Sequence, residues 1–115
     1  MNDQFDISEE IGNAHSVVKV VGELDVATAP QLQAGLEAAI GRGNPLVVAD
    51  LLDVTFIDST ALGVLISCLK QSSAVGATLN IVASAPRILK VFEITGLTDL
   101  FAIFSTVGEA LNGTH

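Results

Sequence analysis

The stretch Asp50 to Leu65, which reads DLLDVTFIDSTALGVL, decides the fold that this chain is expected to adopt. It continues the apolar run Leu46–Ala49, which is typical of a central strand covered on both faces. Asp50 is expected to mark the carboxyl end of that strand, and a short acidic loop follows. From about Thr60 to Ala74 the apolar residues recur with the period of an amphipathic helix. A buried strand that leads into a helix predicts an α/β fold.

The rest of the chain alternates between predicted strands and helices. Because this alternation begins after residue 22, we expect a mixed, mostly parallel sheet of four to five strands with about four helices. The carboxyl ends of parallel strands meet at one edge, so Asp25 is expected to lie there with residues 50–59. The predicted elements are an edge strand over 5–11, a strand over 16–21 that ends at 22–25, a helix over 28–40 with a capping hydroxyl on Thr28, a strand over 46–49, a helix over 60–74, a strand over 78–82, a helix over 84–94, a strand over 101–104 and a helical turn over 107–111.

The predicted helix over residues 60–74 has two faces. Its apolar stripe follows the i, i+3, i+4, i+7 rule and is expected to face the sheet. That stripe consists of Leu62, Leu65, Ile66 and Leu69. The other side is expected to carry Thr60, Gly63, Val64, Ser67 and Gln71. Cys68 is expected to be half-buried on the flank, and a redox-sensing role for it would require exposure and a lowered thiol pKa.

The composition bounds the size and the partners of the protein. With 115 residues, 50% of them hydrophobic, we expect a single domain over 1–115 whose core covers about 5–111. The 13 acidic and 5 basic residues give a net charge of −8. Nucleic acid is not an expected partner, because the basic residues are scattered along the chain, and a basic protein surface would suit it better.

Neither a secreted nor a membrane protein is expected. Cys68 is the only cysteine, which excludes an intramolecular disulfide and a cysteine-based metal cage. The N-terminal residues lack the basic and then apolar order of a signal peptide, and no apolar run approaches the ~20 residues of a membrane helix. We therefore expect a cytoplasmic protein without cofactor or metal.

Ser59, where the acidic loop meets the predicted helix, admits two interpretations. As an N-cap, its oxygen would accept a backbone N–H of the first helical turn and contribute ~1 kcal/mol. As a phosphate acceptor, it would stand at a position that stabilises the phosphate, because a helix N-terminus favours an added anion. Spacing alone favours the cap. A catalytic nucleophile is not expected, because neither His15 near the first hairpin nor the terminal His115 supplies a positioned base.

Three motifs occur together and in order: GELD at 22–25, FIDSTALGVL at 56–65 and FEITGL at 92–97. With them the chain resembles the STAS-domain anti-sigma-factor antagonists of bacteria, over about residues 5–111. The resemblance implies a non-enzymatic protein that, when unphosphorylated, binds an anti-sigma factor, itself a serine kinase, and so releases a sigma factor. Phosphorylation reverses this, and a metal-dependent serine phosphatase restores the active form. The free protein is expected to be a monomer.

The resemblance also assigns site residues. The family's phosphate acceptor directly follows the aspartate of the second motif, which makes it Ser59, with Thr60 as runner-up. Asp58 either orients the hydroxyl or the kinase, or is a solvated or capping carboxylate. Ala61 departs from the glycine often found at its position and should firm the helix start. The expected partner-binding residues are Asp25, Asp58, Ser59, Thr60, Gly63, Val64 and Ser67.

A phosphate on Ser59 would act on a partner through its charge. It would add ~−1.5 to −2 charges beside Asp58, and near Asp50 and Asp53, so that repulsion and desolvation oppose docking.

The resemblance leaves one other function open. Related STAS domains are scaffold subunits of sensory assemblies or of membrane transport complexes, and fold alone does not separate these functions. The serine that follows Asp58 favours the phosphorylated antagonists.

Overall fold

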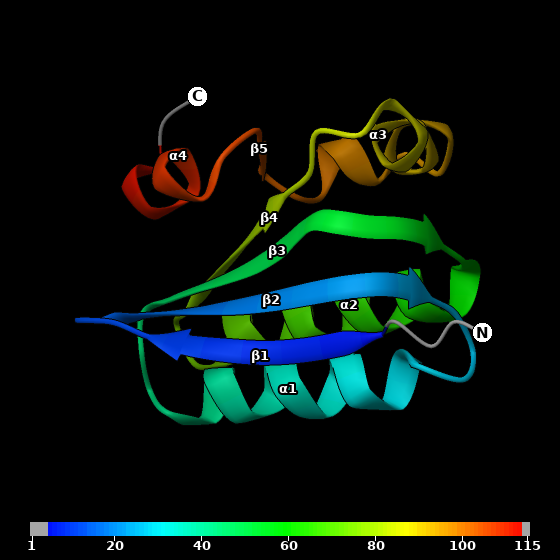
Figure 1. Cartoon of the computed structure of the whole chain (residues 1–115). Helices are drawn as coiled ribbons and strands as arrows, with labels where there is room; N and C mark the ends of the chain where they lie inside the picture. The colour runs from blue at the N-terminus through cyan, green and yellow to red at the C-terminus, as the bar shows by residue number, and fades with distance from the viewer. Residues whose placement is uncertain (1–4, 114–115) are drawn as a thin grey trace.

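The computed structural model describes residues 5–113, which contain a five-stranded sheet, four α-helices and one 3-10 helix (Figure 1). The predicted α/β fold is thus confirmed. Within the same residues, no helix combines the length and the apolar character that crossing a bilayer requires. The elements are β1 (Asp6–Ile11), β2 (His15–Leu24), α1 (Ala29–Gly41), β3 (Leu46–Ile57), α2 (Ser59–Ala74), β4 (Thr78–Val82), α3 (Pro86–Ile94), η1 (Leu97–Asp99), β5 (Ile103–Phe104) and α4 (Val107–Asn112).

The sheet is mixed and mostly parallel, as predicted. Its strands lie in the order β1-β2-β3-β4-β5, with β1 antiparallel to β2 and every other neighbouring pair parallel. The predicted hairpin turns at Gly12, whose N–H donates to the carbonyl of His15 (2.9 Å). β2 is longer than predicted and includes the first three residues of the GELD motif, up to Leu24. Its side chains at Val17 and Val18 are buried on opposite faces, which is typical of an interior strand.

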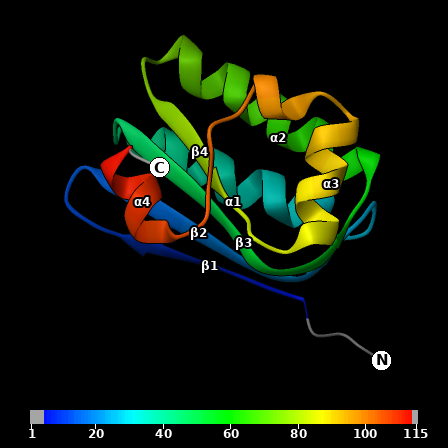
Figure 2. The same cartoon turned by 90° about the horizontal axis from the view of Figure 1, so that it is seen from above.

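Helices cover the two faces of the sheet unequally. α1 and α2 pack side by side against one face (Figure 1), and the main core lies between them and the sheet. α4 lies against the other face (Figure 2). It contacts β3, β4 and β5 there, and a smaller cluster includes Val48, Phe104 and Ala110. The buried residues of α1 are Ala29, Leu32, Leu36, Ala39 and Ile40.

β3 differs most from the prediction. Asp50 does not end the strand, because β3 continues to Ile57 and stays paired with β2 that far. Two shifts of register between β2 and β3, typical of β-bulges, let the longer strand follow the shorter one. Asp50 is tolerated inside the sheet because its carboxylate accepts the N–H of Leu52 (3.1 Å) and lies 3.8 Å from the ammonium of Lys19. Most of the predicted acidic loop is therefore strand.

α2 buries a different set of side chains from the predicted stripe. Leu62 and Leu65 are buried as predicted, and the small residues Ala61, Cys68 and Ser72 complete the buried face. Ser72 is buried among them because its hydroxyl donates to the carbonyl of Leu69 (2.8 Å). Cys68 is fully buried rather than half-buried. The buried residues are Ala61, Leu62, Leu65, Cys68 and Ser72, and the predicted Ile66 and Leu69 are only half-buried.

Thr28 precedes α1, but its hydroxyl does not cap the helix, contrary to the prediction. The hydroxyl accepts the N–H of Asp25 (2.9 Å) and donates to the carbonyl of Glu23 (2.8 Å). Thr28 therefore holds the loop that follows β2. Pro30 occupies the first turn of the helix, as predicted.

Candidate functional site

The carboxyl ends of β2 and β3 lie side by side. Leu24 at the end of β2 is paired with Ile57 at the end of β3, and the N–H of Asp58 donates to the carbonyl of Leu24 (3.0 Å). The loop that begins at Asp25 and the start of α2 at Ser59 therefore meet at one edge of the sheet, as the sequence predicts.

Asp58, and not Ser59, caps α2. The backbone of Asp58 is extended (φ −110°, ψ −179°), and its carboxylate accepts the N–H of Ala61 (3.0 Å). Of the two interpretations of Ser59, the helix cap is therefore ruled out, and the capping alternative for Asp58 is confirmed. Such a cap contributes ~1 kcal/mol. Ala61 is fully buried directly behind this turn.

Ser59 is the first residue of α2, and its side chain is exposed. Within residues 5–113, no protein group forms a hydrogen bond with its hydroxyl. Thr60, the runner-up acceptor, is exposed as well. Because Asp58 supplies the cap, the hydroxyl of Ser59 is accessible to another molecule.

The outer side of α2 becomes less accessible along the helix. Gly63 is exposed, and a Cβ atom added there would meet no other atom within 4 Å. Val64, predicted on the outer side of the helix, is half-buried and packs against the main core. Ser67 is also half-buried and accepts a hydrogen bond from Gln71 (3.4 Å).

A polar network closes the far end of this side. Gln71 donates to the carboxylate of Glu37 on α1 (2.9 Å), and Gln33 donates to the same carboxylate (3.1 Å). The hydrogen bonds from Gln33 and Gln71 lower the pKa of Glu37. Ser67 thus borders a contact between α1 and α2, whereas residues 59–63 lie at the open end of α2.

Asp25 has a structural function of its own at the edge. Its carboxylate accepts the N–H groups of Ala27 (2.9 Å) and Thr28 (3.1 Å), which shapes the loop before α1. Asp25 is half-buried, so one side of it remains open to solvent.

Two apolar residues at this edge were not predicted. Val26, in the loop after β2, is 70% exposed, and Phe56, near the end of β3, is 44% exposed. Val26 directly follows Asp25, and Phe56 lies two residues before Asp58, so exposed apolar residues occur close to both acidic residues in the sequence. A signal for Val26 is present in the sequence, since it stands in a polar loop. The exposure of Phe56 becomes evident only from the structure, in which β3 extends to Ile57.

Asp50 and Asp53 do not contribute free charge to the edge. The ammonium of Lys19 lies 2.9 Å from the carboxylate of Asp53 and 3.8 Å from that of Asp50. The hydrogen bond to Asp53 and then the charge of Asp50 raise the pKa of Lys19. The predicted acidic surroundings of Ser59 therefore reduce to Asp25 and Asp58.

The structure also bears on the other candidate chemistries. Among residues 5–113, no group of three or more His, Cys, Asp or Glu side chains could hold a metal ion. Burial, and then the charge of Glu37, raise the pKa of the Cys68 thiol to about 11, which is opposite to the requirement for a redox sensor. His15 is half-buried at the hairpin, far along β2 from its carboxyl end, and His115 lies outside the described residues.

The fold and the site define a class of protein: a small α/β domain with a mixed sheet that exposes the start of one helix next to acidic and apolar side chains. A model of the STAS domain matches residues 6–110, and the chain belongs to this family. The resemblance seen in the three sequence motifs is thereby confirmed.

Named relatives cover most or all of the chain. The anti-sigma-B factor antagonist of Listeria monocytogenes is 33% identical over 115 residues, which are 100% of this chain and 99% of that protein. The anti-sigma-B factor antagonist of Staphylococcus aureus is 40% identical over 86 residues, which are 75% of this chain and 80% of that protein. The crystal structure of an anti-sigma factor antagonist from Mycobacterium paratuberculosis superimposes with a TM-score of 0.88 at 29% identity and covers 96% of this chain and 94% of that one.

Proposed function

We propose that this chain is an anti-sigma-factor antagonist that binds an anti-sigma factor through the start of α2, and that phosphorylation of Ser59 ends this binding. The observation that carries the proposal is the exposed Ser59 hydroxyl, which the Asp58 cap leaves accessible. The names of the full-length relatives support the same function. The whole chain acts as one STAS domain in this proposal.

The proposed partner is an anti-sigma factor that is also the serine kinase of Ser59. It docks on Thr60 and Gly63 beside the acceptor, where little side chain stands in its way, and on the neighbouring Asp25 loop. The exposed Val26 and Phe56 add apolar contact area, as the centre of a protein interface requires. The half-buried Val64 and Ser67 form the boundary of this surface.

Charge favours a basic docking surface on the partner. The chain carries a net charge of −8, and Asp25 and Asp58 lie at the proposed contact. Complementary charge mainly speeds association and excludes wrong partners. The free antagonist is proposed to be a cytoplasmic monomer, so that the contact remains available.

A phosphate on Ser59 would add ~−1.5 to −2 charges at the first residue of α2. The helix N-terminus offsets part of this charge, so the free protein should stay folded. The docking surface of the anti-sigma factor, which fits a hydroxyl between two carboxylates, would not accommodate the larger and more negative phosphate. The anti-sigma factor would then dissociate and bind its sigma factor again. A metal-dependent serine phosphatase would reverse the modification.

The test compares Ser59→Ala with Ser59→Asp by calorimetry against the candidate anti-sigma factors. Ser59→Ala should bind like the unmodified protein, and Ser59→Asp should bind at least ~10-fold more weakly. Incubation of wild type, Ser59→Ala and Thr60→Ala with the same kinases and ATP identifies the acceptor. Equal affinities of the two Ser59 variants, or a phosphate that Thr60→Ala alone abolishes, would overturn the assignment of Ser59.

A further inference from the structure

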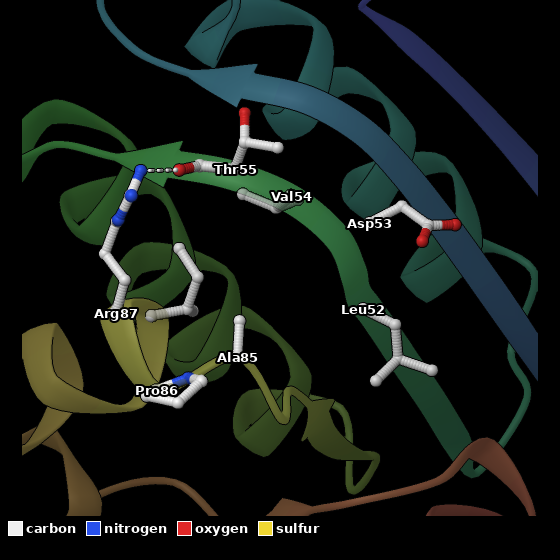
Figure 3. A pocket seen from close by; sticks show the side chains of 8 residues that line it. Leu52, Asp53, Val54, Thr55, Ala85, Pro86 and Arg87 are labelled. Atoms are coloured by element: carbon white, nitrogen blue, oxygen red, sulfur yellow. Dashed lines mark hydrogen bonds between the residues drawn. The ribbon is translucent and has the colours of Figure 1, made fainter.

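The second half of β3 lacks a neighbouring strand on one side. β4 pairs with β3 only from Leu46 to Asp50, whereas β3 continues to Ile57. Beyond β4, this side of β3 faces the start of α3 across an open groove of about 470 Å³, lined by residues 52–55 and 85–88 (Figure 3). Packing between α3 and this part of β3 is therefore incomplete.

Arg87 bridges the groove. Its Nη1 donates to the backbone carbonyl of Thr55 (3.2 Å), the contact drawn as a dashed line in Figure 3. In the part of the chain that the structure describes, this is the only hydrogen bond between α3 and β3, and the Arg87 guanidinium forms no ion pair.

The bonded carbonyl belongs to an irregular position of the strand. The pairing with β2 passes from Val54 directly to Phe56, so Thr55 is the residue that the register skips. A skipped residue leaves backbone groups without ladder partners, and because Thr55 is exposed, Arg87 here takes the place of water as the partner of its carbonyl. Arg87 satisfies this carbonyl three residues before Asp58, where the chain turns into α2.

We infer that Arg87 is a positioning residue for the start of α2. By holding Thr55, it fixes the direction in which β3 ends, and so the placement of the Asp58 cap and of Ser59. The effect on the ends of β3 and α2 follows from the structure alone, and the effect on phosphorylation and docking rests on the proposed function.

The first experiment measures amide hydrogen exchange by NMR in Arg87→Ala. The reporters are the Asp58 N–H, bonded to Leu24, and the Ala61 N–H, bonded to the Asp58 carboxylate. Losing one hydrogen bond of ordinary strength should speed their exchange about 2- to 10-fold. The amide of Ile81, bonded to Ala102 in another part of the sheet, should be unchanged.

Lys90→Ala is the matched control, because Lys90 is exposed on the same helix and its loss removes the same charge. It should leave both reporters unchanged, and Arg87→Lys should restore part of their protection. Equal exchange in Arg87→Ala and Lys90→Ala would overturn the inference. Uniformly faster exchange that includes Ile81 would also overturn it, since Arg87 would then stabilise the whole fold and not this segment.

The second experiment measures the rate of Ser59 phosphorylation and the affinity for the anti-sigma factor in the same variants. Arg87→Ala should reduce both about 2- to 10-fold relative to Lys90→Ala. If the wild type binds no anti-sigma factor, the proposed function fails, but the exchange experiment still tests whether Arg87 positions the start of α2. If the wild type binds and the two variants do not differ, the inference fails while the proposed function stands.

Discussion

Replacing Gly63 by alanine should separate stability from binding. Gly63 lies inside α2, is exposed, and has open space where the new methyl group would stand. Glycine costs ~0.5–1 kcal/mol relative to alanine in a helix interior, so Gly63→Ala should raise the free energy of unfolding by about this amount. For a domain of this size, the melting temperature should rise by roughly 2–6 °C.

The same methyl group should weaken partner binding. In the proposed complex, Gly63 lets the partner approach α2 closely beside Ser59. Interface cores are packed as densely as protein interiors, and an extra methyl group in such packing costs ~1–3 kcal/mol. Calorimetry should therefore show an affinity about 5- to 150-fold lower than that of the wild type.

The control substitution is Gly41→Ala. Gly41 is the last residue of α1, is exposed, and also has no atom within 4 Å of an added Cβ. It lies at the end of α1 away from the Asp25 loop, so Gly41→Ala should leave the affinity unchanged. If Gly63→Ala binds with full affinity, the proposed docking on α2 is refuted. If Gly63→Ala melts at a lower temperature than the wild type, the added methyl group does not stand in open space.

Two further predictions concern titratable groups. Because burial raises the pKa of the Cys68 thiol to about 11, iodoacetamide at pH 8 should modify native protein at a small fraction of the rate found after denaturation in guanidinium; equal rates would show that Cys68 is accessible. The pKa of Glu9 lies below its ordinary value of 4.5, because the Arg42 guanidinium donates two hydrogen bonds to its carboxylate (2.8 Å each). Its stabilising effect is therefore present above about pH 4.5 and lost as the pH falls through the lowered pKa. Glu9→Gln should thus lower the urea midpoint at pH 7, and this deficit should shrink as the pH falls below about 4.5. The exposed neighbour Glu10→Gln should have little effect, and a Glu9→Gln deficit that does not depend on pH would contradict the ion pair as its cause.

The order of the elements follows from local patterns that act over a few residues. Apolar β-branched runs predicted the interior strands, and Gly96 with its left-handed backbone (φ 77°) ends α3 where the sequence indicates. The second sequence motif brought Ser59 to attention through the resemblance to a family, while its spacing alone favoured a cap.

Other features depend on partners that are distant in the sequence. Asp50 stays inside a strand because Lys19 of the neighbouring strand lies within reach of its carboxylate, and no local pattern contains that pair. Arg87 and Thr55 are 32 residues apart and meet only because β4 ends early. Cys68 is buried because it lies on the same face of α2 as Leu65 and Ser72, which the fold covers.

By itself, the sequence determined the α/β class, the mostly parallel sheet and the place of Ser59 at the start of a helix, because hydrophobic period, glycine and proline act locally. Only the tertiary structure decided that Asp58 caps this helix and leaves the Ser59 hydroxyl accessible. Both side chains can cap, and the choice depends on the backbone angles at the end of β3. Those angles are set by pairing with β2, by the bulge at Thr55 and, in our inference, by Arg87, which are contacts between segments that only folding brings together.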